Sequence, residues 1–472
     1  MEAGGNDPAG EVAASRFPGF LIALAAVSRP ANIVIIIADS LRWDSVYGGD
    51  GARLPWVQKN AVEFTAARSA GCWTLPATAS MFTGLLPHQH GADTQSRRGL
   101  DPAVPTLAER LRAVGYATHQ VTANVATTDI FGLDRGFDEV VRIWKEVPPQ
   151  HRKLHELMVL VGKPRLRRKV LSTDWIRGKL SEDIEAGTVW LQDTVAEILD
   201  RCRQILAQNA RRGRPSFVFL NLMETHFPYH VSPIFQTLGS GVEAVRELVA
   251  LYHLVNQTFM ATGEQPTSAA TMARLRSRQR IAWERIAGQI DEFVRELHEG
   301  TENLVVLGSD HGECFGEMGW SYHFANVTDG GTRVPLFWLE PGRAPATVET
   351  PVSARDLFGA VLSTAGVDVQ PGLVRAPEES LAVMESAWYD AQGRTLRRFK
   401  YNQLCFVAGR MRWLRRDGRW YSAPPSTLAG EPEFQPLPGG IDPVEELAPE
   451  AADRTRLRRL VSDFEAYSTR IS

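Results

Sequence analysis

The chain has 472 residues, of which 44% are hydrophobic and 23% are charged. This balance is typical of a globular protein, and it excludes the low apolar content of disordered chains and the biased composition of collagen or coiled coils. The 52 basic and 55 acidic residues leave a formal net charge of -3, so nucleic acid binding through bulk electrostatics is not expected. The length favours one large α/β domain with a smaller second one. Four widely separated cysteines predict reduced thiols rather than a zinc motif or a disulfide scaffold.

Residues 1–30 are predicted to be an N-terminal extension. Their one apolar run, residues 20–27 (FLIALAAV), is too short to span a bilayer. The segment before it is net acidic, which is the wrong sign for the positive start of a signal peptide. With no membrane anchor evident, these features predict a cytoplasmic protein without a membrane partner.

Three predicted strands each end in polar residues. Residues 32–38 (NIVIIIA), 216–222 (SFVFLNL) and 303–307 (NLVVL) have the continuous apolar pattern of strands that are buried on both faces of a parallel sheet. In such sheets ligands bind at the carboxyl ends of the strands. We therefore expect one cluster of polar side chains at that edge: Asp39, His226, Asp310 and His311.

The segments between these strands predict alternating strands and helices. Residues 106–114 have helical spacing and stop before Gly115, and residues 116–122 follow as a strand. Helical insertions are expected at about residues 150–210 and 240–297. The first begins with a basic stretch that forms either a solvated helical face or an electropositive lid.

Residues 371–472 are expected to form a smaller C-terminal α+β subdomain. Their Trp-rich, strand-like segments and the helical spacing of residues 455–467 predict a small antiparallel sheet with a terminal helix. The predicted fold class is therefore α/β, with a mostly parallel central sheet flanked by helices in residues 31–370 and this second unit behind it.

One further segment carries chemistry. Residues 74–84 (TLPATASMFTG) place a hydroxyl residue before Leu-Pro and a short helical run that ends in Thr-Gly. Together with Asp39 and residues 309–313 (SDHGE), this segment resembles the sulfatase branch of the alkaline phosphatase superfamily. Further similar segments extend the resemblance over most of the chain: residues 226–229 (HFPY), 332–336 (TRVPL) and 441–446 (IDPVEE). The resemblance implies the alkaline phosphatase fold and a metal-dependent ester hydrolase.

The sequence departs from the sulfatase pattern at five positions. Ser40 stands where a second Asp is usual after Asp39. Thr74 stands where a Cys-derived formylglycine is usual, and Thr78 stands where an Arg holds that group. Asn124 replaces the Lys and His of a sulfate-binding segment, and His323 takes the place of a downstream Lys. Cys72 lacks the spacing of a modified cysteine. Threonine nucleophiles of this kind resemble the phosphodiesterase and phosphatase branches.

The resemblance and the residue chemistry together assign roles. Carboxylates and an imidazole suit a divalent ion, either calcium or magnesium or, because of His311, zinc or manganese. Coordination would favour the alkoxide of Thr74, which is otherwise a weak nucleophile, and an imidazole would protonate the leaving oxygen. The predicted metal ligands are Asp39, Ser40, Thr74, Asp310 and His311. The predicted catalytic residues are Thr74, His226 and His323, and the predicted substrate-binding residues are Asn124 and Arg42.

These roles predict hydrolysis of a phosphodiester or a phosphonate monoester through an intermediate linked to Thr74. The expected partner is a small anionic ester, and a homo-oligomer is compatible with the sequence. Three alternatives stay open. The first is a sulfate ester hydrolase that uses Thr, the second is a phosphoryl transferase, although those usually carry membrane helices, and the third is a catalytically silent relative that binds an anion.

Overall fold

The structure is a computed structural model. It describes residues 32–48, 54–92, 99–146, 193–227, 229, 269–299, 302–319, 321–323, 327–367, 381–389, 399–408, 410–427, 430–438, 441–447 and 451–471. The predicted N-terminal extension and the basic stretch at residues 151–169 lie outside these residues. Among the described residues, no helix is both long enough and apolar enough to cross a membrane.

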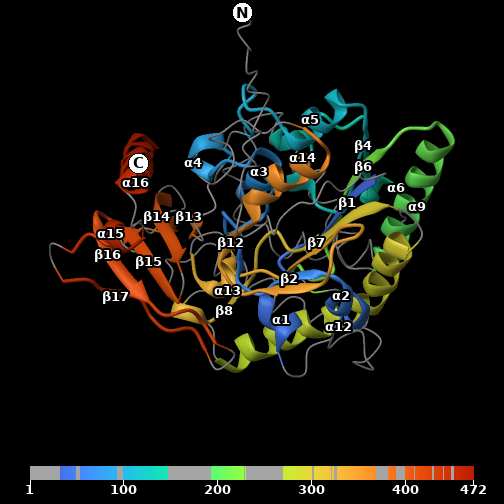
Figure 1. The fold of residues 1–472 in the computed structure, drawn as a ribbon. Coiled ribbons are helices and arrows are strands. Elements are labelled where there is room, and N and C mark those ends of the chain that lie inside the picture. Colours follow the sequence, from blue (N-terminus) through green and yellow to red (C-terminus); the bar gives the residue numbers. More distant parts are fainter. Residues whose placement is uncertain are drawn as a thin grey trace, which may run out of the picture.

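A large, mostly parallel sheet forms the centre of the molecule (Figure 1). Its strands follow the order β11 (Ala346–Val348), β2 (Val62–Phe64), β10 (Leu336–Leu339), β7 (Asn303–Gly308), β1 (Asn32–Ala38), β6 (Ser216–Leu222), β4 (Ala117–Thr122) and β5 (Glu139–Arg142). The run from β7 to β5 is parallel, and β10 is antiparallel to both of its neighbours. The predicted fold class is confirmed.

Helices cover both faces of this sheet because its central strands are apolar on both sides. In β1, Val34 and Ile36 face one core, while Ile33 and Ile35 face the other. Helices α9 (Val195–Arg211) and α12 (Ala269–Glu299) cover the first face. The second face is covered by α3 (Thr74–Thr83), α5 (Leu107–Ala113) and α14 (Leu357–Thr364), as Figure 1 shows.

The helix expected at residues 106–114 is present as α5 and ends before Gly115. Thr106 caps α5 by accepting from the Glu109 N–H, and the Glu109 carboxylate accepts from the Thr106 N–H, which forms a capping box. Gly115 follows with a φ of 96°, a conformation that glycine adopts without a steric penalty. In the described part of the two expected insertions, α9 and α12 are helices. Residues 147–192 and 230–268 lie outside it.

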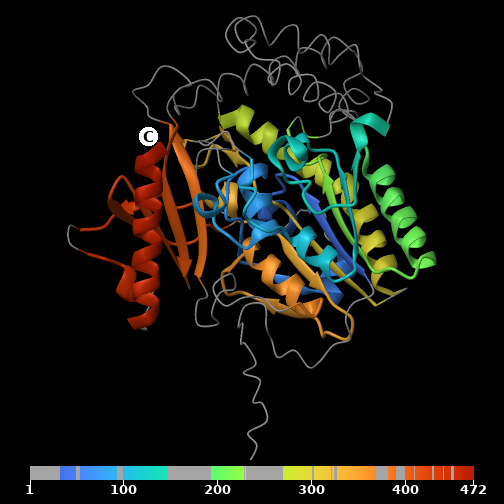
Figure 2. The same cartoon turned by 90° about the horizontal axis from the view of Figure 1, so that it is seen from above.

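The C-terminal residues form a separate antiparallel sheet. Its order is β13 (Leu381–Tyr389), β14 (Phe399–Ala408), β15 (Met411–Arg416), β16 (Arg419–Ala423) and β17 (Gln435–Pro436). Helix α16 (Ala451–Ile471) runs along its outer face and packs with α15 (Val444–Leu447) on an apolar cluster (Figure 2). The predicted small sheet with a terminal helix is confirmed, and the boundary at residue 371 stays a prediction.

Short elements complete the connections. Two small sheets pair β3 (Ala67–Arg68) with β12 (Val352–Ser353), and β8 (Cys314–Phe315) with β9 (Ser321–Tyr322). The short helices are α1 (Trp43–Tyr47), α2 (Pro55–Asn60), α4 (Pro87–His90), α6 (Ile143–Glu146), α13 (Asp329–Thr332), η1 (Val125–Thr127), η2 (Asp129–Phe131), η3 (Glu317–Gly319) and η4 (Ala354–Asp356).

Candidate active site

Four neighbouring strands bring the predicted residues to one edge of the sheet. The strands β7, β1, β6 and β4 are adjacent and parallel, so their carboxyl ends lie side by side. Asp39 follows β1, and Asp310 and His311 follow β7. His226 and Asn124 lie just beyond β6 and β4. The predicted convergence of these segments therefore follows directly from the strand order.

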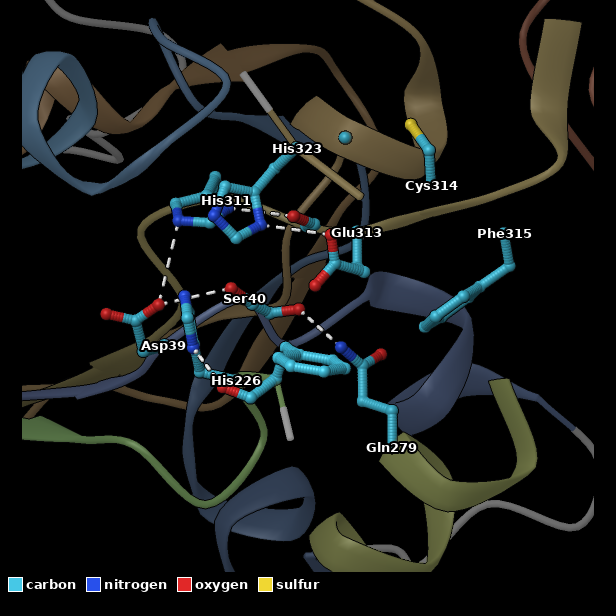
Figure 3. Close-up of polar contacts among 12 residues, drawn as sticks. Asp39, Ser40, His226, Gln279, His311, Glu313, Cys314, Phe315 and His323 are labelled. Atoms are coloured by element: carbon cyan, nitrogen blue, oxygen red, sulfur yellow. Dashed lines mark hydrogen bonds and ion pairs between the residues drawn. The ribbon is translucent and has the colours of Figure 1, made fainter. Parts of the chain in front are cut away.

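Asp39, Asp310 and His311 form the centre of the site, and Figure 3 labels Asp39 and His311 there. One ligand atom from each lies within 4.8 Å of the others, and all three side chains are buried. His311 Nδ1 lies 2.8 Å from the carbonyl oxygen of Gly312, so Nδ1 carries the proton and Nε2 keeps its lone pair. That Nε2 is 3.6 Å from an oxygen of Asp39 and 3.5 Å from Oδ2 of Asp310.

The electrostatics of this cluster fit a bound cation. Burial and the neighbouring charge of Asp39 raise the pKa of Asp310 well above its ordinary value. Burial also acts to raise the pKa of Asp39, but His226 and His311, together with hydrogen bonds from Asn221 and Asn124, outweigh it and lower that pKa. Oδ2 of Asp310 has no hydrogen-bond partner among the described residues. Two buried carboxylates beside a neutral imidazole are a costly arrangement that a divalent ion would relieve, so the donor set fits such an ion.

Thr74 begins α3 and points into this cluster. Its Oγ1 lies 3.3 Å from Nε2 of His311 and 3.4 Å from Oδ2 of Asp39. The Asn124 amide donates to Thr74 Oγ1 at 3.1 Å and to Asp39 Oδ2 at 2.7 Å. Because Thr74 is the first residue of a ten-residue helix, the positive end of the helix dipole also favours negative charge here. The structure thus brings the predicted nucleophile, Asn124 and the metal cluster together.

Ser40 connects the two acidic residues. Its N–H donates to Asp310 at 3.2 Å, and its hydroxyl donates to Asp39 at 3.1 Å. Its φ of 61° lies in the left-handed region, which a serine enters only at a cost. The tight turn after β1 is therefore held in a strained conformation by the site itself.

His226 and His323 lie beside the metal cluster, with their ring centroids 5.1 Å apart. The ring of His323 is 4.6 Å from the ring of His311. Burial lowers the pKa of both imidazoles, and for His323 the neighbouring histidines lower it further. His226 Nδ1 lies 2.7 Å from the Phe227 carbonyl oxygen, so Nε2 is left as a proton acceptor.

Arg42 lies in a different environment from the one predicted. Its guanidinium pairs with Asp44 at 2.7 Å and with Glu317 at 2.9 Å, and the Arg42 side chain is 4% exposed. It also donates to the carbonyl oxygen of Glu313. These contacts already neutralise the Arg42 charge and hold the loop after β7, which argues against the predicted role in binding substrate.

Two polar residues of the site, Asn221 and Gln279, were not identified from the sequence, and a third, Glu313, has different partners from those expected. Asn221 donates to Asp39 at 3.1 Å, and its place as a polar residue inside an apolar strand was a usable signal. Glu313, the last residue of the segment 309–313, was expected to hold either His311 or a loop amide, whereas its carboxylate contacts His323 at 3.0 Å and accepts from Tyr229 at 3.2 Å. Gln279 reaches the site from α12, and no local motif marks it.

This fold and this cluster define an ester hydrolase of the alkaline phosphatase superfamily. The sulfatase family model matches residues 31–367, and the chain belongs to that family. Among curated proteins it is similar to a choline-sulfatase from Rhizobium meliloti (strain 1021), at 26% identity over 72% of this chain and 68% of that protein. It is also similar to arylsulfatase A from Bos taurus, at 24% identity over 94% of this chain and 90% of that protein.

The fold has solved relatives as well. A phosphonate monoester hydrolase from Silicibacter pomeroyi superposes with a TM-score of 0.61 at 18% identity, and the match covers 92% of this chain and 95% of that one. At this identity the similarity concerns the fold alone. The chemistry of this chain must therefore be argued from its own side chains.

Proposed function

We propose that the protein hydrolyses phosphodiesters or phosphonate monoesters, with Thr74 Oγ1 as the nucleophile. The observation that carries this proposal is the position of that hydroxyl, which is in contact with Asp39, His311 and Asn124 at the start of α3. Asp39, Asp310 and His311 would hold a divalent ion, with Ser40 and Thr74 beside them. When bound, such an ion would lower the pKa of the threonine hydroxyl and polarise the ester.

The reaction has two displacements. Thr74 Oγ1 forms a bond to phosphorus while the bond to the leaving oxygen breaks, and a site imidazole passes the threonine proton to that oxygen. Water then attacks the phosphorus atom, and the bond between phosphorus and Thr74 Oγ1 breaks. The imidazole takes a proton from the water and passes it to Thr74 Oγ1, which restores the hydroxyl. His226 is suited to this task because its Nδ1 contacts the Phe227 carbonyl oxygen, which makes Nε2 the unprotonated nitrogen, and His323, held by Glu313, is the second candidate.

The charge of the site favours a monoanionic ester. Asn124 supplies a neutral amide where sulfatases resembling this chain have Lys and His, and the Arg42 guanidinium is paired with Asp44 and Glu317. A dianionic phosphate monoester would gain less from neutral donors than from cationic ones. Phosphodiesters and phosphonate monoesters carry a single charge and suit this environment better.

A panel of four p-nitrophenyl substrates tests the proposal. The expected order of kcat/KM is bis-phosphate and phenylphosphonate first, phosphate monoester next and sulfate last. Mass spectrometry of rapidly quenched reactions should find a phosphoryl group on the peptide that contains Thr74. Absence of hydrolysis of all four esters by protein loaded with Mn2+ or Zn2+ would leave a silent anion-binding relative as the better interpretation.

The second candidate is sulfate ester hydrolysis, which family membership and the similarity to choline-sulfatase favour. Its difficulty is chemical. A formylglycine hydrate carries a second hydroxyl that expels sulfate, whereas threonine carries one and needs water to break the intermediate. A preference for the sulfate ester, measured on protein whose mass shows unmodified Thr74, would support this candidate over the first.

A further inference from the structure

We propose that Gln279 is a positioning residue that fixes the spacing between the metal-binding turn and the imidazole loop. Gln279 lies on α12 and is fully buried. Its amide nitrogen donates to the carbonyl oxygen of Ser40 at 2.8 Å and to that of Thr225 at 3.0 Å (Figure 3 draws the first of these contacts). One side chain from a helix on the face of the sheet therefore joins the ends of two strands.

Each of the two loops carries a residue of the site. Ser40 follows Asp39 and is held at a φ of 61°, so its carbonyl needs a partner to stay in this orientation. Thr225 precedes His226, and its hydroxyl donates to the Asp39 carbonyl oxygen at 2.6 Å. Gln279 thus links the backbone that follows Asp39 to the backbone that precedes His226, and it does so without touching the reacting groups.

The position of Gln279 on α12 is otherwise apolar. One turn before it lies Leu275, and one turn after it lies Trp283, both in hydrophobic clusters. The amide oxygen of Gln279 has no hydrogen-bond partner among the described residues. A buried amide with an unmatched oxygen costs stability, and an apolar residue of similar volume would avoid that cost. The two donated bonds to the site loops are the compensation that this structure provides.

The catalytic part of this inference rests on the proposed function, whereas the part that concerns the metal site does not. Gln279→Met keeps the volume and removes both donors. We expect the Mn2+ dissociation constant, measured by competition with a fluorescent chelator, to rise about 10- to 100-fold, the range found for residues that orient metal ligands. We expect kcat on the best ester of the panel to fall by about the same factor while KM stays within about threefold.

Asn209→Leu is the matched control. Asn209 is also a buried amide on a helix, and it donates two bonds, to His119 at 2.9 Å and to Ser216 at 3.1 Å, but Ser216 is at the amino end of β6, away from the site. Its loss should lower the thermal unfolding midpoint while the Mn2+ dissociation constant and kcat stay within about twofold, because it touches neither site loop. An equal loss of Mn2+ affinity in both variants would assign Gln279 a merely structural role and overturn the proposal.

Two further measurements keep the test decisive. If Gln279→Met does not fold, Gln279→Asn retains an amide that reaches at most one carbonyl, and we expect a smaller change in the same direction. In metal-free protein, amide hydrogen exchange around residues 40–42 should be faster in the Gln279 variants than in wild type. A folded variant with wild-type Mn2+ affinity and exchange would refute the inference. If the wild type hydrolyses no ester, the proposed function fails, while the Mn2+ affinity and the exchange rates still decide the role of Gln279.

Discussion

Two buried charged clusters of this protein have opposite electrostatics. The first, called the metal cluster, is the candidate ion site at Asp39, Asp310 and His311. The second, called the docking network, contains Arg68, Asp329, Arg333, Arg412 and Glu431. Burial acts to raise the pKa of both Asp310 and Asp329. The charge of Asp39 adds to that effect at Asp310, whereas Arg68 and Arg412 outweigh it at Asp329 and hold the pKa there well below its usual range. Burial alone therefore does not identify a functional acid. The contrast lies in the charged neighbours: Asp310 is buried beside Asp39, whereas Asp329 is buried beside Arg68 and Arg412.

The docking network joins the two parts of the chain. Arg68 from β3 lies 3.0 Å from Asp329 of α13, and Arg412 from β15 lies 2.5 Å from Glu431. Glu431 in turn accepts the Asp329 N–H at 2.7 Å. The partners come from the small β3–β12 sheet, from α13 and from the C-terminal residues, so these ion pairs attach the C-terminal sheet to the rest of the molecule.

The two clusters meet through α13. The Gly312 N–H, next to His311, donates to the Gly331 carbonyl oxygen at 2.8 Å. A Cβ added at Gly312 would lie 2.1 Å from the Gly330 carbonyl oxygen, so only glycine permits this approach. The docking network thus supports the loop that carries Asp310 and His311 of the metal cluster, and the predictions below separate the contributions of the two clusters.

The largest effect is expected at the nucleophile. Thr74→Ala should lower turnover by roughly three orders of magnitude or more, because it removes the attacking oxygen. Thr74→Ser keeps the hydroxyl and should retain part of the rate. Both variants should unfold in urea near the wild-type midpoint, since Thr74 is not part of the docking network. Near wild-type turnover in Thr74→Ala would exclude a covalent intermediate at this residue.

The second prediction concerns a variant that removes one arginine from the docking network. Arg412→Met leaves Glu431 without its cationic partner in a buried site and leaves Arg68 as the ion-pair partner of Asp329, which should cost about 3–5 kcal/mol of unfolding free energy. The folded fraction should keep its specific activity within a few-fold. Urea titrations and activity measured at low urea test both parts.

Arg415→Met is the matched control for that variant. Arg415 lies three residues further along β15 and pairs with Glu465 at 2.8 Å, but both side chains are partly exposed. Such a pair contributes about 0–1 kcal/mol, so a loss as large as that of Arg412→Met would contradict the distinction between buried and exposed pairs.

The sequence predicted those parts of the site that depend on local pattern. Asp39, His226 and Asp310 each follow a buried apolar strand, and parallel strands must bring their ends to one edge. Thr74 was found because its segment has a motif. These positions require no knowledge of how distant parts of the chain pack.

The remaining contacts depend on distant partners that no pattern specifies. Gln279 lies 239 residues from Ser40, and Arg68 lies 261 residues from Asp329. The environment of Arg42 differs from the predicted one for the same reason. Glu317 neutralises the Arg42 charge, and no sequence motif links these two residues. Local spacing therefore predicts which residues reach the edge, while tertiary packing decides which of them remain free to meet a substrate.

The third prediction is that Asp310→Asn stabilises the metal-free protein but reduces the stabilisation that Mn2+ provides. In metal-free protein, Asp310→Asn should raise the unfolding free energy by on the order of 1–3 kcal/mol, because it removes a poorly compensated buried carboxylate. Excess Mn2+ should then stabilise wild type, by about 2.7 kcal/mol at a hundredfold excess over the dissociation constant, and the variant much less. Thermal unfolding with chelator and with Mn2+ measures both.

Glu349→Gln is the control for charge alone, since Glu349 is exposed. It should change neither the metal-free stability nor the shift caused by Mn2+. If Asp310→Asn is less stable than wild type in the presence of chelator, the Asp310 carboxylate does not destabilise the metal-free protein, and the prediction is wrong.

The smallest effect concerns a third buried pair, which joins the same two parts of the chain and can be changed by pH alone. His88 of α4 contacts Glu385 of β13 at 2.5 Å, with Phe464 and Tyr467 of α16 against its ring. Burial acts to lower the His88 pKa, but Glu385, helped by Asp463 and opposed by Arg355, raises it above 6.5. A histidine whose folded pKa is raised stabilises the fold fully below pH 6.5, and this contribution is lost as the pH rises through the folded pKa.

The difference in unfolding free energy between wild type and His88→Gln should therefore be about 1 kcal/mol at pH 6 and decline at pH 9. His119→Gln is the control, because burial lowers the His119 pKa and its contribution should instead be lost as the pH falls. If the difference in unfolding free energy between wild type and His88→Gln is the same at pH 6 and at pH 9, the His88 charge takes no part in joining α4 to the C-terminal sheet.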